Sequence, residues 1–126
     1  MIKVTINEIL NVIPILQELI NKPFKGNITF KIARLIRELE KENFLFEESR
    51  LKLANKYGMK NQKGELNISE GVIKLQEDKI EECNEELTNL LLTEVEINAE
   101  PLPIEVFNDI EISPAQAVIL EKFINN

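Results

Sequence analysis

The feature that most restricts the fold of this chain is a long amphipathic run from Ile28 to Tyr57. Hydrophobic residues recur along it with a seven-residue rhythm, which is typical of one side of an antiparallel helical hairpin or coiled coil. They are Ile32, Leu35, Ile36, Leu39, Phe46, Leu53, Ala54 and Tyr57. The sequence therefore predicts one long helix, with Asn27 as its N-cap and Gly58 as the left-handed residue after its last turn.

Two capping signals predict shorter helices near the ends of the chain. Thr5 and Glu8 have capping-box spacing, which predicts a helix that continues through Asn21. Its hydrophobic stripe is expected at Ile9, Leu10, Ile13, Leu16, Leu19 and Ile20. Pro14 lies inside this helix, where it removes a backbone hydrogen bond, so a kink is expected near Leu10 to Ile13.

The second capping signal combines a serine, a proline at the first helical position and a glutamine at the third. These residues, Ser113, Pro114 and Gln116, predict a helix from Pro114 to Ile124 with Ala117, Leu120 and Phe123 or Ile124 in the core. A further helix is predicted from Gln76 to Leu92. Its hydrophobic side is expected to hold Ile80, Cys83, Leu87, Leu90 and Leu91.

Alternation of hydrophobic and polar residues predicts a few short strands. The segments are Val4 to Ile6, Leu66 to Ile68, Thr93 to Ile97 and Ile110 to Ile112, with Val72 to Leu75 as a hairpin partner or as the start of the next helix. Prolines make Pro101 to Ile104 extended. The expected fold class is α+β, mainly α: a long helical hairpin or bundle with a Pro-kinked first helix and a few short β-strands. A length of 126 residues predicts one domain, 1–126.

Composition limits the chemistry. The chain has no histidine and one cysteine, Cys83, which excludes histidine-based nucleophile pairs and zinc sites with histidine or several cysteine ligands. No glycine-rich phosphate loop is present, because the four glycines are far apart. We therefore expect no enzyme activity, no cofactor and no metal. The N-terminal sequence lacks a signal peptide and no hydrophobic run is long enough for a membrane span, so a cytoplasmic protein is expected.

Charge is distributed unevenly. Between Lys22 and Lys63, eleven basic and five acidic residues give a net charge of +6. The rest of the chain has a net charge of −13, so the whole chain has a net charge of −7. Such polarity favours an electrostatically steered partner or subunits that meet head to tail. The plainer interpretation is that every helix has a solvated charged face. The carboxylates of the helix from Gln76 to Leu92, which include Glu81, Glu82, Glu85 and Glu86, are interpreted in that way.

Six residues of the long helix are candidates for binding. Arg34, Arg37 and Lys41 recur at i, i+3 and i+7 and form a basic row, although Glu38 and Glu42 are placed to pair with it. Phe44, Leu45 and Phe46 cannot all face one core, so Phe44 and Leu45 are expected to supply exposed hydrophobic surface beside the row. The alternative is that the segment Pro101 to Phe107 covers Phe44.

Arg50 is the sixth candidate. It lies on the hydrophobic stripe, which favours a buried pair with a glutamate of the Gln76 to Leu92 helix. The alternative is an interface residue.

Six segments, taken in order, carry a resemblance to a known family: Ile9 to Leu16, Arg34 to Leu39, Glu48 to Leu53, Lys56 to Gly58, Asn84 to Leu87 and Ile112 to Gln116. Together they resemble a family of small uncharacterised proteins of bacteriophages and prophages of Gram-positive, Clostridium-like hosts. The resemblance covers nearly the whole chain, rests on structural signatures, and carries over no catalytic residue. It implies a viral protein in the cytoplasm of a bacterial host.

The expected function follows from these points together. It is a non-enzymatic phage accessory protein that binds a host or defence-system protein, or a nucleotide signal, as an inhibitor or sponge. The alternative is a virion structural or assembly protein of the capsid, tail or neck. The partner is expected to be a protein, with a homo-oligomer left open. Duplex nucleic acid is disfavoured by the acidic net charge.

Overall fold

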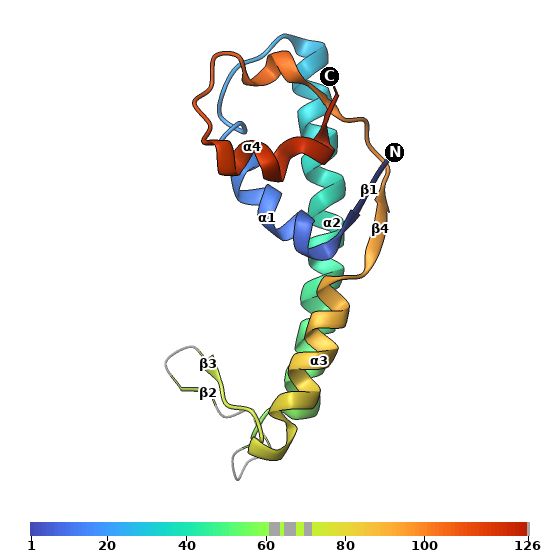
Figure 1. The fold of residues 1–126 in the computed structure, drawn as a ribbon, viewed down its shortest axis with the longest axis vertical. Helices are drawn as coiled ribbons and strands as arrows, with labels where there is room; N and C mark the ends of the chain where they lie inside the picture. Colours follow the sequence, from blue (N-terminus) through green and yellow to red (C-terminus); the bar gives the residue numbers. More distant parts are fainter. Residues whose placement is uncertain (61–63, 65–67, 70–71, 126) are drawn as a thin grey trace. The chain divides into compact units, whose positions relative to one another are not determined.

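A computed structural model describes all of the chain except residues 61–63, 65–67, 70–71 and 126 (Figure 1). The fold is mainly α with a few short strands, as the sequence predicts. The chain divides into two compact units. Unit 1 comprises Met1–Asn43 and Thr93–Asn126, and unit 2 comprises Phe44–Leu92. One helix, α2 (Gly26–Tyr57), is continuous across the boundary between them. The expectation of one domain stays a prediction.

Unit 1 begins with a two-stranded antiparallel sheet. Strand β1 (Ile2–Thr5) pairs with β4 (Glu94–Ile97) in a register that places Val4 opposite Val95. Alternate residues of β1, Ile2 and Val4, are buried, whereas Lys3 points outward and pairs with Glu94 at 3.3 Å. One face of this small sheet therefore belongs to the core of unit 1.

Helix α1 (Ile6–Gln17) follows β1 directly and starts at the predicted capping box. The Glu8 amide donates to Thr5 Oγ1 at 3.2 Å and the Thr5 amide donates to Glu8 Oε1 at 3.0 Å. The helix ends at Gln17 rather than Asn21, and Pro14 lies inside it.

The predicted hydrophobic stripe of α1 was wrong at one edge. Ile20 lies after the helix end and is exposed, and Leu10 and Ile13 are only half-buried. The buried residues of α1 are Ile6, Ile9, Val12, Ile15 and Leu16, and Leu19 is buried in the turn after the helix. The inward side of α1 is thus rotated from the predicted one.

The C-terminal part of unit 1 closes its core. Strand β5 (Leu102–Pro103) pairs in parallel with β6 (Ile124–Asn125), and the 3₁₀-helix η2 (Ile104–Phe107) follows β5. Helix α4 (Pro114–Leu120) has the predicted capping box, with both Ser113–Gln116 hydrogen bonds present. It continues as the 3₁₀-helix η3 (Glu121–Phe123), and Leu120 and Phe123 are fully buried.

The predicted strand from Ile110 to Ile112 was wrong. The amides of Asn108 and Ile110 donate to the carbonyls of Glu105 and Phe107, at 3.2 Å each, so the chain turns here instead of pairing. Ile110 and Ile112 are half-buried, which explains the alternating pattern without a strand.

The predicted end of α2 at Tyr57 is confirmed, but the predicted residues at both caps were wrong. The helix starts at Gly26, because the Lys25 carbonyl accepts from the amides of Ile28 and Thr29 at 2.9 Å, so Asn27 lies in the first turn and is not the N-cap. Gly58 is not left-handed, since Gly64 is the one glycine with positive φ in the described part of the chain. Gly58 instead forms an antiparallel bridge with Leu75.

Unit 2 contains the C-terminal part of α2, a hairpin, the 3₁₀-helix η1 (Glu77–Lys79) and helix α3 (Ile80–Leu91). The predicted hairpin is confirmed as β2 (Ile68–Ser69) paired with β3 (Val72–Ile73). Other parts of that prediction, including Leu66, Asn67 and Gly71, lie outside the described residues.

Helix α3 runs alongside α2 within unit 2 (Figure 1). Lys56 Nζ donates to Glu86 Oε1 at 3.2 Å. Hydrogen bonds from Lys56 and Tyr57 lower the pKa of Glu86 below its ordinary value. Cys83 is buried in this unit, as the sequence predicts.

Arg50 does not form the predicted buried pair. Its guanidinium contacts Glu47 of the same helix, with Nη2 to Oε2 at 2.7 Å, and the two side chains are 52% and 44% exposed. The prediction from the seven-residue rhythm was wrong for Arg50, because an exposed ion pair with Glu47, three residues earlier on the same helix, satisfies its charge.

We therefore expect Arg50→Ala to change the free energy of unfolding by at most about 1 kcal/mol, since exposed ion pairs contribute little and alanine favours helix. Thermal unfolding followed by circular dichroism measures this. A loss several times larger would show that Arg50 has a buried partner after all.

Glu8 makes the stability of unit 1 depend on pH. Lys122 Nζ lies 2.8 Å from Glu8 Oε2 and 3.0 Å from Oε1. Burial opposes the charge on Glu8, but the hydrogen bonds from Lys122 and Thr5 outweigh it and hold the pKa of the carboxyl below 4.5.

Because the folded pKa is lowered, Glu8 stabilises the folded state above about pH 4.5 and loses this contribution as the pH falls through the folded pKa. Wild type should therefore lose more stability than Glu8→Gln when the pH is lowered through this range. Urea unfolding at several pH values tests this. Equal losses in the two proteins would contradict it.

Candidate functional site

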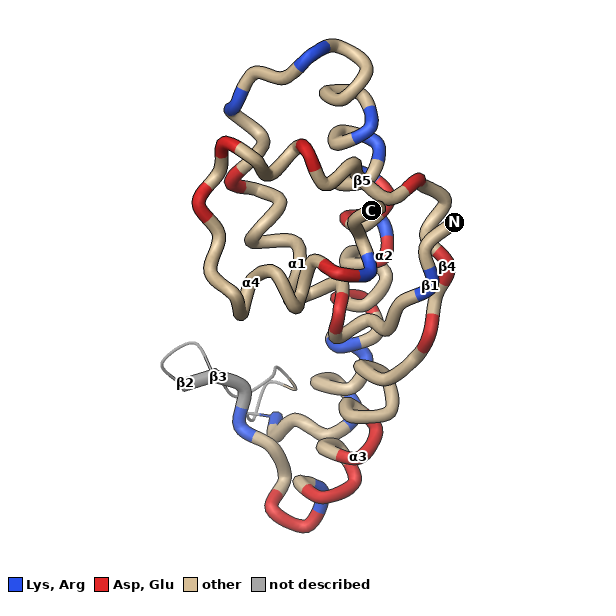
Figure 2. The backbone as a smooth tube through the Cα atoms, turned by 45° about the horizontal axis from the view of Figure 1, so that its top comes forward, with Lys and Arg blue, Asp and Glu red and all other residues tan. Residues whose placement is uncertain are grey.

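The predicted basic row lies on the part of α2 that belongs to unit 1, and its three residues have different surroundings. Lys41 Nζ pairs with Glu38 Oε1 at 3.0 Å, as one alternative predicted. Arg34 Nε donates to the main-chain carbonyl of Asn98 at 3.2 Å. Arg37 makes no hydrogen bond or ion pair with any residue that the structure describes. Figure 2 shows several basic positions along α2 and others in the loop before it.

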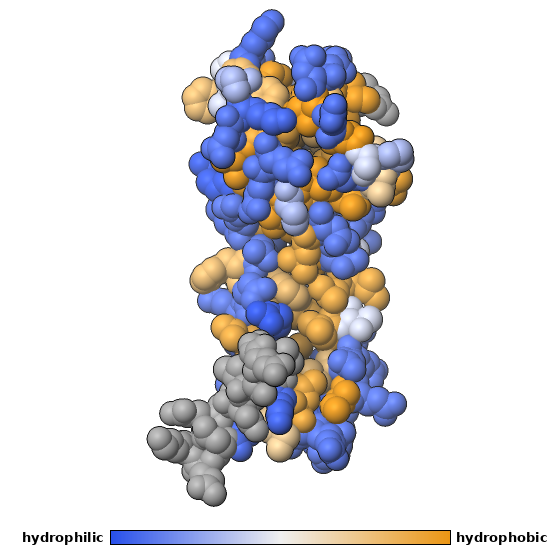
Figure 3. Space-filling view, turned by 90° about the vertical axis from the view of Figure 1, so that its left-hand side faces the viewer, coloured by the Kyte–Doolittle hydropathy of each residue, from blue (hydrophilic) through white to orange (hydrophobic). Residues whose placement is uncertain are grey.

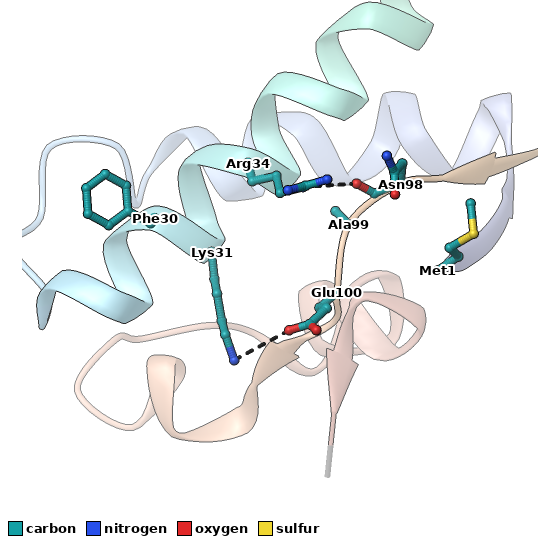
Figure 4. A pocket seen from close by; sticks show the side chains of 7 residues that line it. All are labelled: Met1, Phe30, Lys31, Arg34, Asn98, Ala99 and Glu100. Atoms are coloured by element: carbon teal, nitrogen blue, oxygen red, sulfur yellow. Dashed lines mark hydrogen bonds and ion pairs between the residues drawn. The ribbon is translucent and has the colours of Figure 1, made fainter.

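A pocket of about 480 Å³ lies beside Arg34 (Figure 4). Its lining residues are Met1, Phe30, Lys31, Arg34, Asn98, Ala99 and Glu100. Arg34 reaches toward Asn98 and Lys31 toward Glu100, with Lys31 Nζ 3.6 Å from Glu100 Oε2, while the ring of Phe30 points away from both pairs. The two basic side chains of this pocket are therefore already engaged.

A second hollow, the α1–α2 groove, lies beside Arg37 and has a volume of about 330 Å³. It is formed by the segment that follows α1 and by the first half of α2. Its hydrophobic lining consists of Leu19, Ile20, Phe24, Ile32, Ala33 and Ile36. Lys22, Arg37 and Glu40 are the charged lining residues, so their formal charge is +1. The groove thus combines a hydrophobic interior with an arginine that has no partner within the described chain.

The other three predicted binding residues belong to unit 2. Phe44 is 64% exposed and Leu45 is 54% exposed, whereas Phe46 is buried. The expectation that Phe44, Leu45 and Phe46 do not share one core is therefore confirmed. The alternative that Phe44 is covered does not agree with its exposure. Arg50 forms the exposed ion pair with Glu47 that is described above.

Cys83 is buried, and most of the acidic residues of α3 lie at the surface. Burial, followed by the charge of Glu86, raises the pKa of the Cys83 thiol, which keeps it protonated and weakly nucleophilic. The described residues contain no group of three or more acidic or cysteine side chains that could hold a metal ion. On the acidic face of α3, Glu82 pairs with Lys79 at 3.7 Å and Glu86 pairs with Lys56 at 3.2 Å, whereas Glu81 and Glu85 are exposed.

No protein-family model, curated protein or solved structure matches the chain. The resemblance to phage proteins and the functions expected from it therefore stay predictions. Among the described residues, no helix has the length and hydrophobicity that a membrane crossing requires.

Sequence reasoning identified Arg37 but missed the groove beside it. Ile20 and Ile36 had been assigned to buried stripes, whereas Ile20 is exposed and Ile36 is half-buried. Pro23 was the sequence signal that could have indicated the groove. Proline limits how far α1 continues, so the hydrophobic residues that follow Gln17 need not lie on the buried side of a helix.

Proposed function

We propose that this protein is a non-enzymatic binding protein that captures an acidic, partly hydrophobic segment of a partner protein in the α1–α2 groove. The observation that carries the proposal is Arg37, an arginine without a described partner beside a hydrophobic groove of about 330 Å³. Arginine next to a hydrophobic pocket is a frequent source of binding energy at protein interfaces.

The charges around the groove support an acidic partner. Lys22 and Arg37 outnumber Glu40 in the lining, and Lys25 lies on the loop that precedes α2. A positive surface raises the encounter rate with an acidic segment, and a hydrophobic anchor then slows dissociation. Catalysis is not part of the proposal, since the chain has no histidine and the Cys83 thiol is buried and protonated.

The resemblance to phage proteins supplies the biological setting of the proposal. In it, the protein acts in the cytoplasm of an infected bacterium, and the partner is a host or defence-system protein that the capture inhibits.

Affinity capture from phage-infected cells tests the proposed function. Tagged wild type should retain a partner that mass spectrometry identifies, and Arg37→Glu should lose it. Lys74→Glu is the matched control, because it makes the same change of charge at an exposed residue of unit 2 and should retain the partner. A partner retained equally by all three proteins would contradict the assignment to the groove.

A further inference from the structure

Unit 2 buries few hydrophobic side chains. Among its described residues, the buried hydrophobic ones are Phe46, Tyr57 and Cys83. The large hydrophobic residues that stay exposed are Phe44, Leu45, Leu51, Met59, Ile80 and Leu92. Figure 3 shows hydrophobic residues at the molecular surface between hydrophilic ones. Two helices alone enclose little core, so a helical hairpin is usually stabilised by a further layer.

The part of α2 in unit 2 has hydrophobic residues on two sides. Phe46, Leu53 and Tyr57 are spaced by seven and four residues and form the inner side, where they are buried or half-buried. Phe44 and Leu51 are also seven residues apart, so they share the outer side, where they are 64% and 51% exposed. A helix that is hydrophobic on two sides fits a position between two packing partners.

Charges on the outer sides of the two helices are complementary. Lys52 follows Leu51 on the outer side of α2, and Glu81 and Glu85 lie on the outer side of α3, opposite the buried Cys83. None of the three makes an ion pair with a described residue. Figure 2 shows the acidic positions of α3. The outer side of α2 therefore suits α3 of another molecule of the same chain.

The spacings on the two helices also agree. Phe44 and Lys52 are eight residues apart on α2, which is about 12 Å, and Leu92 lies seven residues after Glu85, which is about 10 Å. An antiparallel neighbour thus brings Lys52 close to Glu85 and Phe44 close to Leu92 at the same time. Leu92 is 61% exposed and available for such a contact.

We propose that unit 2 dimerises with a second copy of this chain to form a four-helix bundle. In it, α2 of each copy packs on α3 of the other. Each contact occurs twice because the pair is related by two-fold symmetry. This interface uses unit 2 alone and is independent of the proposed partner site in unit 1.

Light scattering coupled to size-exclusion chromatography tests the proposal on the full chain. Wild type should have twice the chain mass of 14.5 kDa, and Phe44→Glu should raise the dissociation constant by about 30-fold or more while far-UV circular dichroism retains the helices. Phe30→Glu is the matched control, because Phe30 is a more exposed phenylalanine on the same helix in unit 1 and should leave the dimer intact. A monomeric wild type, or equal effects of the two variants, would overturn the proposal.

A charge exchange tests the arrangement even if Phe44→Glu does not fold. Lys52→Glu and Glu85→Lys should each weaken the dimer by about 3- to 10-fold, and the two changes together should restore it. Absence of restoration in the double variant would show that α2 does not pack on α3 of the second copy in this way.

Discussion

Truncation of Phe123 to alanine should lower the free energy of unfolding by about 3–5 kcal/mol, the largest effect on stability that we expect from a single substitution here. The Phe123 side chain is fully buried at the end of η3, directly before the β6 strand that pairs with β5. Its removal takes away buried hydrophobic surface and leaves a cavity that the surrounding core fills only in part.

Urea unfolding followed by circular dichroism measures this loss, which suits a chain without tryptophan. Phe30→Ala is the control, because Phe30 is 77% exposed and its truncation should change stability by about 0.5 kcal/mol or less. If Phe123→Ala were no more destabilising than Phe30→Ala, the C-terminal segment would not be part of the core of unit 1.

Reversal of both arginines, Arg34→Glu with Arg37→Glu, should weaken binding of the captured partner on the order of 100-fold. Two effects add in this variant. The attraction for an acidic segment becomes repulsion, which slows association, and the contact of Arg37 at the groove is lost, which speeds dissociation. Both side chains are exposed, so the fold should be retained.

The matched control changes the same number of charges in unit 2. Lys60→Glu with Lys74→Glu alters two exposed lysines on either side of the hairpin and should leave the affinity within about 3-fold of wild type. Equal losses of affinity in the two double variants would indicate that binding responds to net charge alone. The groove would then not be the binding site.

The parts of the fold that the sequence predicted are those fixed by residues close together in the chain. Each capping box, Thr5 with Glu8 and Ser113 with Gln116, depends on two residues three positions apart, and both are present. Strand β4 was predicted to within one residue, and the hairpin was one of two alternatives, because strand alternation and turn residues are local signals.

The errors arose where distant contacts decide the outcome. Gly58 was predicted to be left-handed, but its pairing with Leu75, seventeen residues away, makes the chain extended instead. Ile20 satisfied the helical period and yet lies past the end of α1. The groove could not be predicted for the same reason, because it depends on how the segment after α1 packs beside α2.

The two proposals also bear on the alternative that this protein is a virion or assembly component. A closed dimer through unit 2 agrees with a binding protein that presents two copies of the α1–α2 groove. Assembly beyond the dimer, seen as a larger mass in the light-scattering experiment, would favour the virion alternative.

The salt dependence of partner binding tests the central claim most directly. The dissociation constant of wild type and of Arg34→Glu with Arg37→Glu is measured for the captured partner from about 0.05 M to about 0.5 M salt, where screening removes most attraction between exposed charges. We predict that wild-type binding weakens at least about 10-fold over this range, mainly through slower association, whereas binding of the variant does not weaken, because salt screens repulsion in it instead of attraction. Wild-type affinity that does not vary with salt, or equal salt dependence in the two proteins, would contradict the claim that this basic surface recognises an acidic partner.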